Sequence, residues 1–291
     1  MKSHRQKLVA TLLAFLPLVW GCAATSVSSV LPGAVGIAST GAVKAAKASH
    51  EITDSEEYYI GRAVAARVLS KYPLYNDPKV TEYVNEVGQT VARKSARPHT
   101  YKGYHFAVLD TNELNAFACP GGIIFITRGL LNTCANEDEL AAVLAHECSH
   151  VANKDGINSI SKARWTEVWT AMGTEAARQY GGVAGNLVTL FEGSIDDVFK
   201  TIVVNGYSRT AEEAADAGAV TTLSRAGYDS GALSATLKKM IAKEKGTSGG
   251  IFKTHPPTSE RLAKVEAAGG KEKASPAEAK RAQRFKKAAK G

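Results

Sequence analysis

The 291-residue sequence predicts an α+β fold that is mostly helical and contains a small β-sheet. Several segments repeat apolar residues at the spacing of amphipathic helices. Two short runs, residues 104–110 and 121–127, are instead rich in the aromatic and β-branched residues that favour strands. A chain of this length can bury a sizeable core, as one large domain or two small ones.

The N-terminal residues have the features of a targeting signal. Three basic residues precede an apolar run over residues 8–20, which is shorter than the roughly 20 residues of a membrane-spanning helix. The run is followed by a glycine and Cys22, which resembles the site where bacterial lipoproteins are cleaved and lipidated. We expect residues 1–21 to be a lipoprotein signal peptide, Cys22 to carry the lipid, and residues 22–50 to be a flexible tether. The alternative is ordinary secretion with an incidental cysteine.

The net charge of +8 is unevenly distributed along the chain. Residues 1–21 contribute three positive charges and residues 271–291 contribute six, so the remainder is near neutral. A near-neutral body lacks the basic face typical of nucleic-acid-binding proteins, and no nucleic-acid partner is predicted. The segment 271–291 is expected to be a disordered basic tail.

Two helices are predicted before the first strand. In "ITDSEEYYIGRAVAARVLSKYP", Asp54 and Glu57 have the spacing of a capping box, and a proline ends the segment. Asp77 is the expected cap of the second helix, and a proline occupies its first turn. The apolar face of that helix consists of Val80, Tyr83, Val84, Val87 and Val91.

The strands at 104–110 and 121–127 are predicted to be joined by the loop "TNELNAFACP". A helix then begins at Asn136, whose side chain suits the N-cap and is followed by three acidic residues that complement the helix dipole. Further helices are expected over residues 157–205, from Thr210, and after "HPPTSER", residues 255–261.

The helix that begins at Asn136 carries the sequence HECSH. His146 and His150 are four residues apart, so both imidazoles lie on one helix face and can bind one metal ion. Glu147 lies about 100° round the helix, within reach of a water molecule at that metal. This H-E-x-x-H arrangement is typical of zinc metallopeptidases, where the glutamate is the general base. Two hydrogen-bonded histidines on an ordinary helix are the alternative.

A catalytic zinc ion needs a third protein ligand, and the segment "YSRTAEEAADAGAV" offers one. Glu212 and Asp216 are four residues apart on a predicted helix and share a face. We predict that Glu212 binds the metal and that Asp216 accepts a hydrogen bond from His146. Glu213 is the rival ligand, but its position fits a helix capping box and it points away from the Asp216 face.

These motifs follow one another in the order HECSH, YSRTAEEAAD and HPPTSER, and "NAFACPGGIIFITRGLL" precedes them. Together they resemble the gluzincin metallopeptidase family of HtpX, BepA and the CAAX prenyl proteases, over residues 51–265. The resemblance implies a zincin-like metallopeptidase domain over residues 51–270, with the small sheet packed beside the active-site helix. It also implies one zinc ion per chain and endopeptidase activity. The chain is most similar to periplasmic BepA-type protease domains, without their tetratricopeptide repeats.

The resemblance suggests roles for residues outside the two helices. His255 matches the histidine-proline block of the family, where it either donates a hydrogen bond to the oxyanion as a catalytic residue or plugs the open zinc position. An ordinary loop histidine is the remaining alternative. Arg261 is expected either to anchor this block by a salt bridge or to be solvated. Asn115 and Ala116 are candidates for an edge strand that pairs with extended substrate, against the alternative of an ordinary sheet connection.

The predicted reaction is metal-assisted hydrolysis of peptide bonds. Zinc held by His146, His150 and Glu212 polarises the carbonyl, and Glu147 moves the proton from water to the leaving nitrogen. The expected substrates are unfolded or misassembled cell-envelope proteins, as part of protein quality control.

The expected location is the periplasm of a Gram-negative bacterium, with the lipid on Cys22 holding the protein at the outer membrane. The outer-membrane protein assembly machinery is a predicted partner. One alternative is a chaperone-like polypeptide-binding module with largely latent protease activity, although the intact Glu147 counts against pure binding. A structural lipoprotein with an accidental motif would leave Glu212 and Asp216 unexplained.

Two further features are left open by the sequence. Cys119 and Cys134 are able to form a disulfide, and the sequence does not decide whether they do. Trp165, Trp169 and Met172 have helical spacing, which favours core packing and leaves a lid over the cleft as the alternative.

Overall fold

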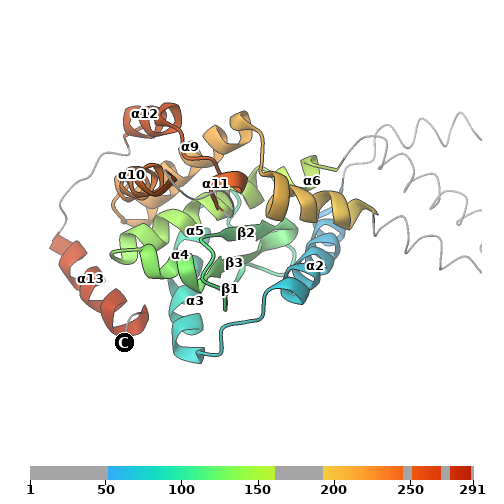
Figure 1. Ribbon diagram of the computed structural model, residues 1–291, viewed down its shortest axis with the longest axis horizontal. Coiled ribbons are helices and arrows are strands. Elements are labelled where there is room, and N and C mark those ends of the chain that lie inside the picture. The colour runs from blue at the N-terminus through green and yellow to red at the C-terminus, as the bar shows by residue number, and fades with distance from the viewer. Residues whose placement is uncertain (1–51, 161–192, 245–250, 270–275, 290–291) are drawn as a thin grey trace, which may run out of the picture. The chain divides into compact units, whose positions relative to one another are not determined.

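The computed structural model describes residues 52–160, 193–244, 251–269 and 276–289 (Figure 1). All of them belong to one compact unit that spans Lys47–Gly291. The elements are α2 (Asp54–Lys71), α3 (Pro78–Ala92), β1 (His105–Leu109), β2 (Ala116–Cys119), η1 (Pro120–Gly122), β3 (Ile123–Thr127), α4 (Arg128–Thr133), α5 (Glu137–Ala152), α6 (Asp155–Asn158), η2 (Thr201–Asn205), α9 (Arg209–Ala226), α10 (Ala232–Glu244), α11 (Ile251–Thr254), α12 (Ser259–Ala267) and α13 (Pro276–Ala289).

Several predicted features lie outside the described residues. They are the signal peptide, Cys22, the tether, and the stripe of Trp165, Trp169 and Met172. The rest of the long helical prediction can be compared with the structure: residues 193–200 are helical and continue into the π-helix η2. No helix among the described residues is long and apolar enough to cross a membrane.

The predicted fold class is confirmed, because the described chain is mostly helical with one three-stranded sheet. The strand order is β1-β3-β2, with β1 parallel and β2 antiparallel to β3. The strand β2 lies within residues 111–120, which the sequence pattern predicted as a loop and in which the family resemblance suggested an edge strand at Asn115 and Ala116. Its four residues, AFAC, include two alanines and no β-branched residue, so their sequence carries little strand signal.

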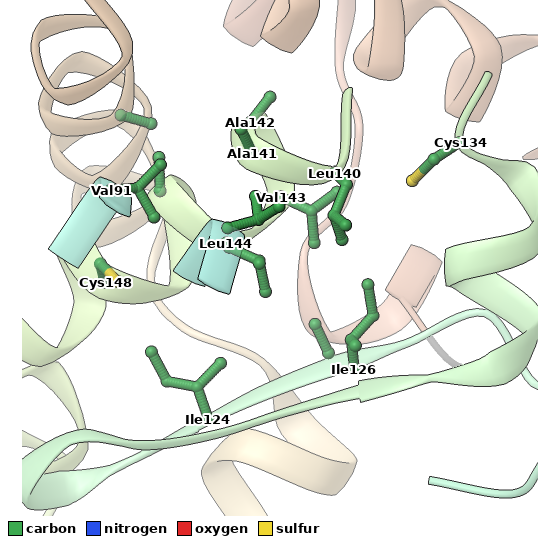
Figure 2. Close-up of a cluster of buried hydrophobic side chains, with 14 of the residues drawn as sticks. Val91, Ile124, Ile126, Cys134, Leu140, Ala141, Ala142, Val143, Leu144 and Cys148 are labelled. Carbon is green, nitrogen blue, oxygen red and sulfur yellow. The ribbon is translucent and has the colours of Figure 1, made fainter. Parts of the chain in front are cut away.

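The sheet separates two apolar clusters, because alternate residues of each strand point to opposite faces. Ala116, Ala118, Ile124 and Ile126 belong to the cluster that also contains residues of α3, α5, α9 and α10. Figure 2 shows part of this cluster, with Ile124 and Ile126 of β3 facing residues of α5. Phe117, Cys119 and Phe125 belong to the second cluster, with residues of α2 and η2. Cys119, Cys134 and Cys148 are all free, buried thiols, so Cys119 and Cys134 do not form a disulfide.

The helix α5 runs through the larger cluster and is buried on almost every side. Leu140, Leu144 and Cys148 are completely buried. The predicted cap is present, since Asn136 Oδ1 accepts a hydrogen bond from the Glu139 N–H at 2.9 Å. The helix that carries the HECSH motif is therefore a rigid part of the core.

The helices α2 and α3 both begin with a side-chain N-cap. Asp77 caps α3 as predicted, since its Oδ1 accepts from the N–H groups of Lys79 and Val80. The cap predicted for α2 was displaced by one residue. Thr53 is the N-cap and forms a capping box with Glu56.

The segment 271–291, expected to be disordered, contains the helix α13, which packs against α3 and α5 (Figure 1). One apolar residue, Phe285, is 1% exposed and lies against Tyr83 with ring centroids 6.3 Å apart. Arg281 Nε donates to Asp138 Oδ2 at 2.7 Å and Arg284 Nε donates to Glu137 Oε2 at 2.6 Å. The basic composition of this segment suggested a solvated tail. Its arginines instead pair with buried carboxylates of α5, which orders the helix.

Candidate metal centre

The helix α5 carries three buried side chains of the motif, His146, Glu147 and His150. His146 and His150 are 6% and 1% exposed, and Glu147 is 1% exposed. The Nε2 atoms of the two histidines lie 3.1 Å apart. Spacing along one helix thus brings two imidazole nitrogens together, as the sequence predicted.

The helix α9 supplies a carboxylate to the same point. The backbones of α9 and α5 approach closely at Gly218, where an added Cβ would lie 2.7 Å from Ser149 Oγ. Glu212 points between the histidines, with Oε2 3.4 Å from His146 Nε2 and Oε1 3.4 Å from His150 Nε2. Glu213, the rival, lies outside the site and pairs with Lys264 at 2.6 Å.

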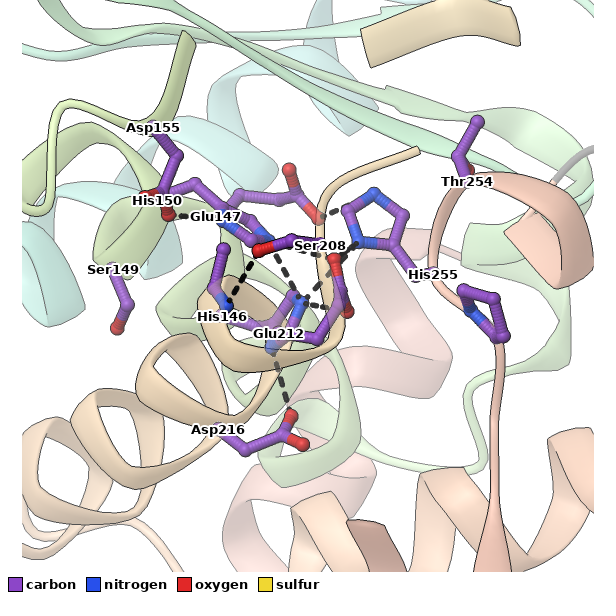
Figure 3. Close-up of polar contacts among 12 residues, drawn as sticks. His146, Glu147, Ser149, His150, Asp155, Ser208, Glu212, Asp216, Thr254 and His255 are labelled. Atoms are coloured by element: carbon purple, nitrogen blue, oxygen red, sulfur yellow. Dashed lines mark hydrogen bonds and ion pairs between the residues drawn. The ribbon is translucent and has the colours of Figure 1, made fainter. Parts of the chain in front are cut away.

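His255 completes the cluster from the segment that follows α11 (Figure 3). Its Nδ1 lies 2.9 Å from Glu212 Oε1 and 3.4 Å from His146 Nε2. Its Nε2 lies 3.9 Å from Glu147 Oε1. One ligand atom from each of His146, His150, Glu212 and His255 lies within 4.8 Å of the other three.

These distances fit a metal ion. With Zn–N bonds of about 2.0–2.1 Å, the donors of a tetrahedral site lie about 3.3–3.4 Å apart. The four donors that converge here are separated by 2.9–3.4 Å along the contacts given above. Three imidazole nitrogens and a carboxylate are also the donor types that zinc prefers. In addition, Glu147 Oε2 is buried with no hydrogen-bond partner in the described chain, which leaves an acceptor free beside the cluster.

Two carboxylates orient the histidines from behind. His146 Nδ1 lies 3.0 Å from Asp216 Oδ1, and His150 Nδ1 lies 2.7 Å from Asp155 Oδ2. A carboxylate on the far nitrogen fixes the tautomer and the ring orientation of a ligand histidine. Asp216 lies beside the His146 nitrogen with which the sequence analysis paired it, but the contact does not have the angles of a hydrogen bond. Asp155 was missed, and its only sequence signal is its place five residues after His150.

Arg261 ties the block after His255 to this site. Its Nε and Nη2 donate to the two oxygens of Asp216, both at 2.8 Å, and its Nη1 lies 2.9 Å from Glu212 Oε2. Nη1 also donates to the Pro256 carbonyl at 2.9 Å. Arg261 is only 3% exposed, so the predicted anchoring salt bridge is present and the solvated alternative is wrong.

The carboxylates make the cluster attractive to positive charge. Burial lowers the pKa of His146, but Asp216 and Glu212 outweigh burial and raise that pKa from 6.5 to about 10. Burial raises the pKa of Glu212, but the charge of His255 and hydrogen bonds from the other histidines lower it overall. A metal ion that binds these nitrogens would displace protons from them.

Comparison with known proteins agrees with this geometry. The sequence profile of Peptidase family M48 matches residues 78–268, about two thirds of the chain. The chain belongs to peptidase family M48. The predicted enzyme class, a metallopeptidase, is thereby confirmed. The family implies a metal ion, and His146, His150, Glu212 and His255 form a possible site for it.

Individual M48 relatives are distant in sequence. The beta-barrel assembly-enhancing protease of Escherichia coli (strain K12) is 27% identical over 270 residues, which cover 89% of this chain and 51% of that protein. Metalloprotease YcaL of the same strain is 26% identical over 195 residues, covering 67% of this chain and 70% of YcaL. A protease HtpX homolog of Salinibacter ruber is 29% identical over 188 residues, which cover 56% of this chain and 67% of that protein. The chain thus spans about half the length of the beta-barrel assembly-enhancing protease.

In this M48 chain, Asn115 and Ala116 lie at the start of the edge strand of the sheet. Ala116 begins the edge strand β2, which packs against α5. Asn115 Oδ1 accepts hydrogen bonds from the Ala116 N–H at 3.0 Å and from Thr254 Oγ1 at 3.2 Å. Asn115 is 1% exposed and Ala116 is fully buried.

A second residue that the sequence prediction missed is Tyr207, the first residue of the motif that contains Glu212. Its ring stacks on the His150 imidazole, with centroids 4.3 Å apart and planes inclined by 29°. The centroid of His255 lies 6.1 Å from that of Tyr207. Tyr207 therefore contacts the metal centre directly.

Proposed function

We propose that the protein is a zinc-dependent endopeptidase that binds one zinc ion through His146, His150 and Glu212. The convergence of these three side chains beside Glu147 carries the proposal. Zinc bound there would supply Lewis-acid activation of the peptide carbonyl and of water.

In this proposal, Glu147 is the general base and the general acid of the reaction. Its free carboxylate oxygen accepts the proton of the attacking water and later delivers it to the leaving nitrogen. Asp216 and Asp155 hold the ligand histidines in one orientation during this exchange. Arg261 in turn holds Asp216 and keeps the buried carboxylates from repelling one another.

The proposed substrates are extended polypeptides from unfolded or misassembled envelope proteins. An added chain would pair with the outer side of β2, the last strand of the sheet, near Asn115 and Ala116, which favours unfolded over folded proteins. The name of the beta-barrel assembly-enhancing protease supports a role in envelope protein assembly. We further propose the outer-membrane protein assembly machinery as a partner.

The proposed domain layout follows from the sequence. Residues 1–21 are a signal peptide, 22–50 a tether and 51–270 the peptidase domain, against which the helix α13 packs. A lipid on Cys22 holds the protein at the outer membrane on its periplasmic side. The basic n-region, the apolar run and the glycine before Cys22 support this layout.

Cleavage of casein, an unfolded test protein, examines the proposed activity. The full-length protein should cleave casein, and Glu147→Gln should not, with equal zinc content in both. Glu213→Gln is a matched control, because that glutamate pairs with Lys264 outside the site, and it should cleave at the parent rate. Equal cleavage by Glu147→Gln would show that this glutamate is not the base.

A chaperone-like module with latent protease activity is the second candidate. It is favoured by the burial of all four cluster residues, of which His255 is 4% exposed, and by the place of His255 among the donors. A site with four protein ligands is closed, whereas a catalytic one keeps a position open. His255→Ala should raise casein cleavage if His255 is a plug and slow it if His255 stabilises the oxyanion. An unchanged rate would remove both roles.

A further inference from the structure

Tyr207 follows a π-helix and a glycine with positive φ. The π-helix η2 ends at Asn205, and the next residue, Gly206, has φ 81°. An added Cβ at Gly206 would lie 2.4 Å from the Thr254 carbonyl oxygen and 2.8 Å from that of Lys253. Glycine is therefore required where this segment crosses α11, and π-helical turns are frequent at functional sites.

The ring and the hydroxyl of Tyr207 have different surroundings. The ring is fixed by the stack on His150. The hydroxyl is buried and has no hydrogen-bond partner in the described chain, although part of the residue is exposed. Buried polar groups are nearly always paired, so an unpaired donor beside a metal centre calls for a ligand. A phenol keeps its proton at neutral pH and can donate it.

Pro120 and the Tyr207 hydroxyl both lie close to Gly156. A Cβ added to Gly156 would lie 3.7 Å from the Tyr207 hydroxyl and 3.0 Å from Cγ of Pro120. Pro120 directly follows the edge strand β2 and has no N–H group. A peptide paired with β2 would therefore find no main-chain donor at that position.

We propose that the Tyr207 hydroxyl binds a main-chain carbonyl of an extended peptide laid along β2, in place of the N–H that Pro120 lacks. The inference rests on the proposed peptidase function and names a substrate-binding residue for it. The ligand class is the polypeptide main chain, so this contact adds affinity without sequence preference. The ring of Tyr207 positions His150 and is not part of the contact.

Tyr207→Phe separates the two parts of the side chain, because it keeps the stack on His150 and removes only the hydroxyl. The binding assay uses a fluorescent casein-derived peptide and full-length, zinc-loaded Glu147→Gln protein, which retains the peptide uncleaved. Adding Tyr207→Phe should weaken the peptide Kd by about tenfold, the usual effect of one hydrogen bond. Zinc content should not change. The apo protein should unfold at the same or a higher temperature, because an unpaired buried hydroxyl is removed.

Tyr104→Phe is the matched control. The Tyr104 hydroxyl is paired, since it donates to the Arg97 carbonyl at 2.8 Å. Its removal should lower the unfolding temperature and leave the peptide Kd unchanged. A role of Tyr207 in stability alone would produce this same pattern in Tyr207→Phe.

The outcomes separate this inference from the proposed function. An unchanged peptide Kd in Tyr207→Phe would overturn the inference, even if the wild-type protein cleaves casein. The expected loss of affinity would uphold it, even if the wild-type protein does not cleave casein. No detectable peptide binding by the Glu147→Gln parent would also overturn it.

Discussion

Arg261 neutralises two buried carboxylates, so its replacement by methionine should strongly destabilise the protein. Its guanidinium holds both oxygens of Asp216 and lies 2.9 Å from Glu212, and the side chain is 4% exposed. Methionine has a comparable length but leaves Asp216 without its charged donors. Breaking a buried ion pair in this way costs about 3–5 kcal/mol. Urea unfolding of the zinc-free protein, followed by circular dichroism at pH 7, measures this loss.

Arg209→Met is the matched control. Arg209 belongs to the same region, but its side chain is 72% exposed and pairs with Glu260 at 3.4 Å. Its loss should cost about 0–1 kcal/mol. In an Asp216→Asn background, Arg261→Met should cost clearly less than in the wild type, because the carboxylate it serves is gone. A cost for Arg261→Met no greater than for Arg209→Met would refute the reasoning.

Three further changes are predicted. Phe285→Ala should lower the free energy of unfolding by about 3–5 kcal/mol in the same urea assay, because Phe285 is 1% exposed. A decrease below about 1 kcal/mol would mean that α13 does not pack against the rest of the domain. Burial raises the pKa of Glu137, but hydrogen bonds from Arg284 and two tyrosines lower this pKa overall. The Glu137 carboxylate therefore stabilises the folded protein above the unfolded-state pKa of about 4.5. This stabilisation is lost as the pH falls through the folded-state pKa. Glu137→Gln should therefore be less stable at pH 7 and lose less stability on acidification than wild type; parallel pH profiles would contradict this. Asp155→Asn should weaken zinc binding by about 10–100-fold in a chelator competition, and an unchanged affinity would show that Asp155 does not hold His150.

The parts of the site that follow from helix periodicity could be predicted from the sequence. His146 and His150 come together because they are four residues apart on one helix, and Glu212 and Asp216 share a face of α9 for the same reason. The order of the motifs then indicated that the two helices meet at one metal. Distances within a helix depend only on backbone geometry, which local sequence determines.

The features that depend on tertiary contacts could not be predicted in this way. The strand β2 is strand-like only because it pairs with β3, and α13 is ordered because Arg281 and Arg284 find buried carboxylates on α5. Tyr207 reaches His150 only because Gly206 lets the chain cross α11. The partners of α13 and Tyr207 lie far away along the chain, and the alanine-rich residues of β2 carry little strand signal although β3 follows closely.

The central claim is that one zinc ion is bound by His146, His150 and Glu212. Anomalous X-ray diffraction at the zinc absorption edge, from crystals of the zinc-loaded wild-type protein, tests it most directly. We expect one peak per chain at about 2.0–2.1 Å from Nε2 of each of the two histidines and from a carboxylate oxygen of Glu212. A peak bound by other residues, or no peak at this cluster, would contradict it.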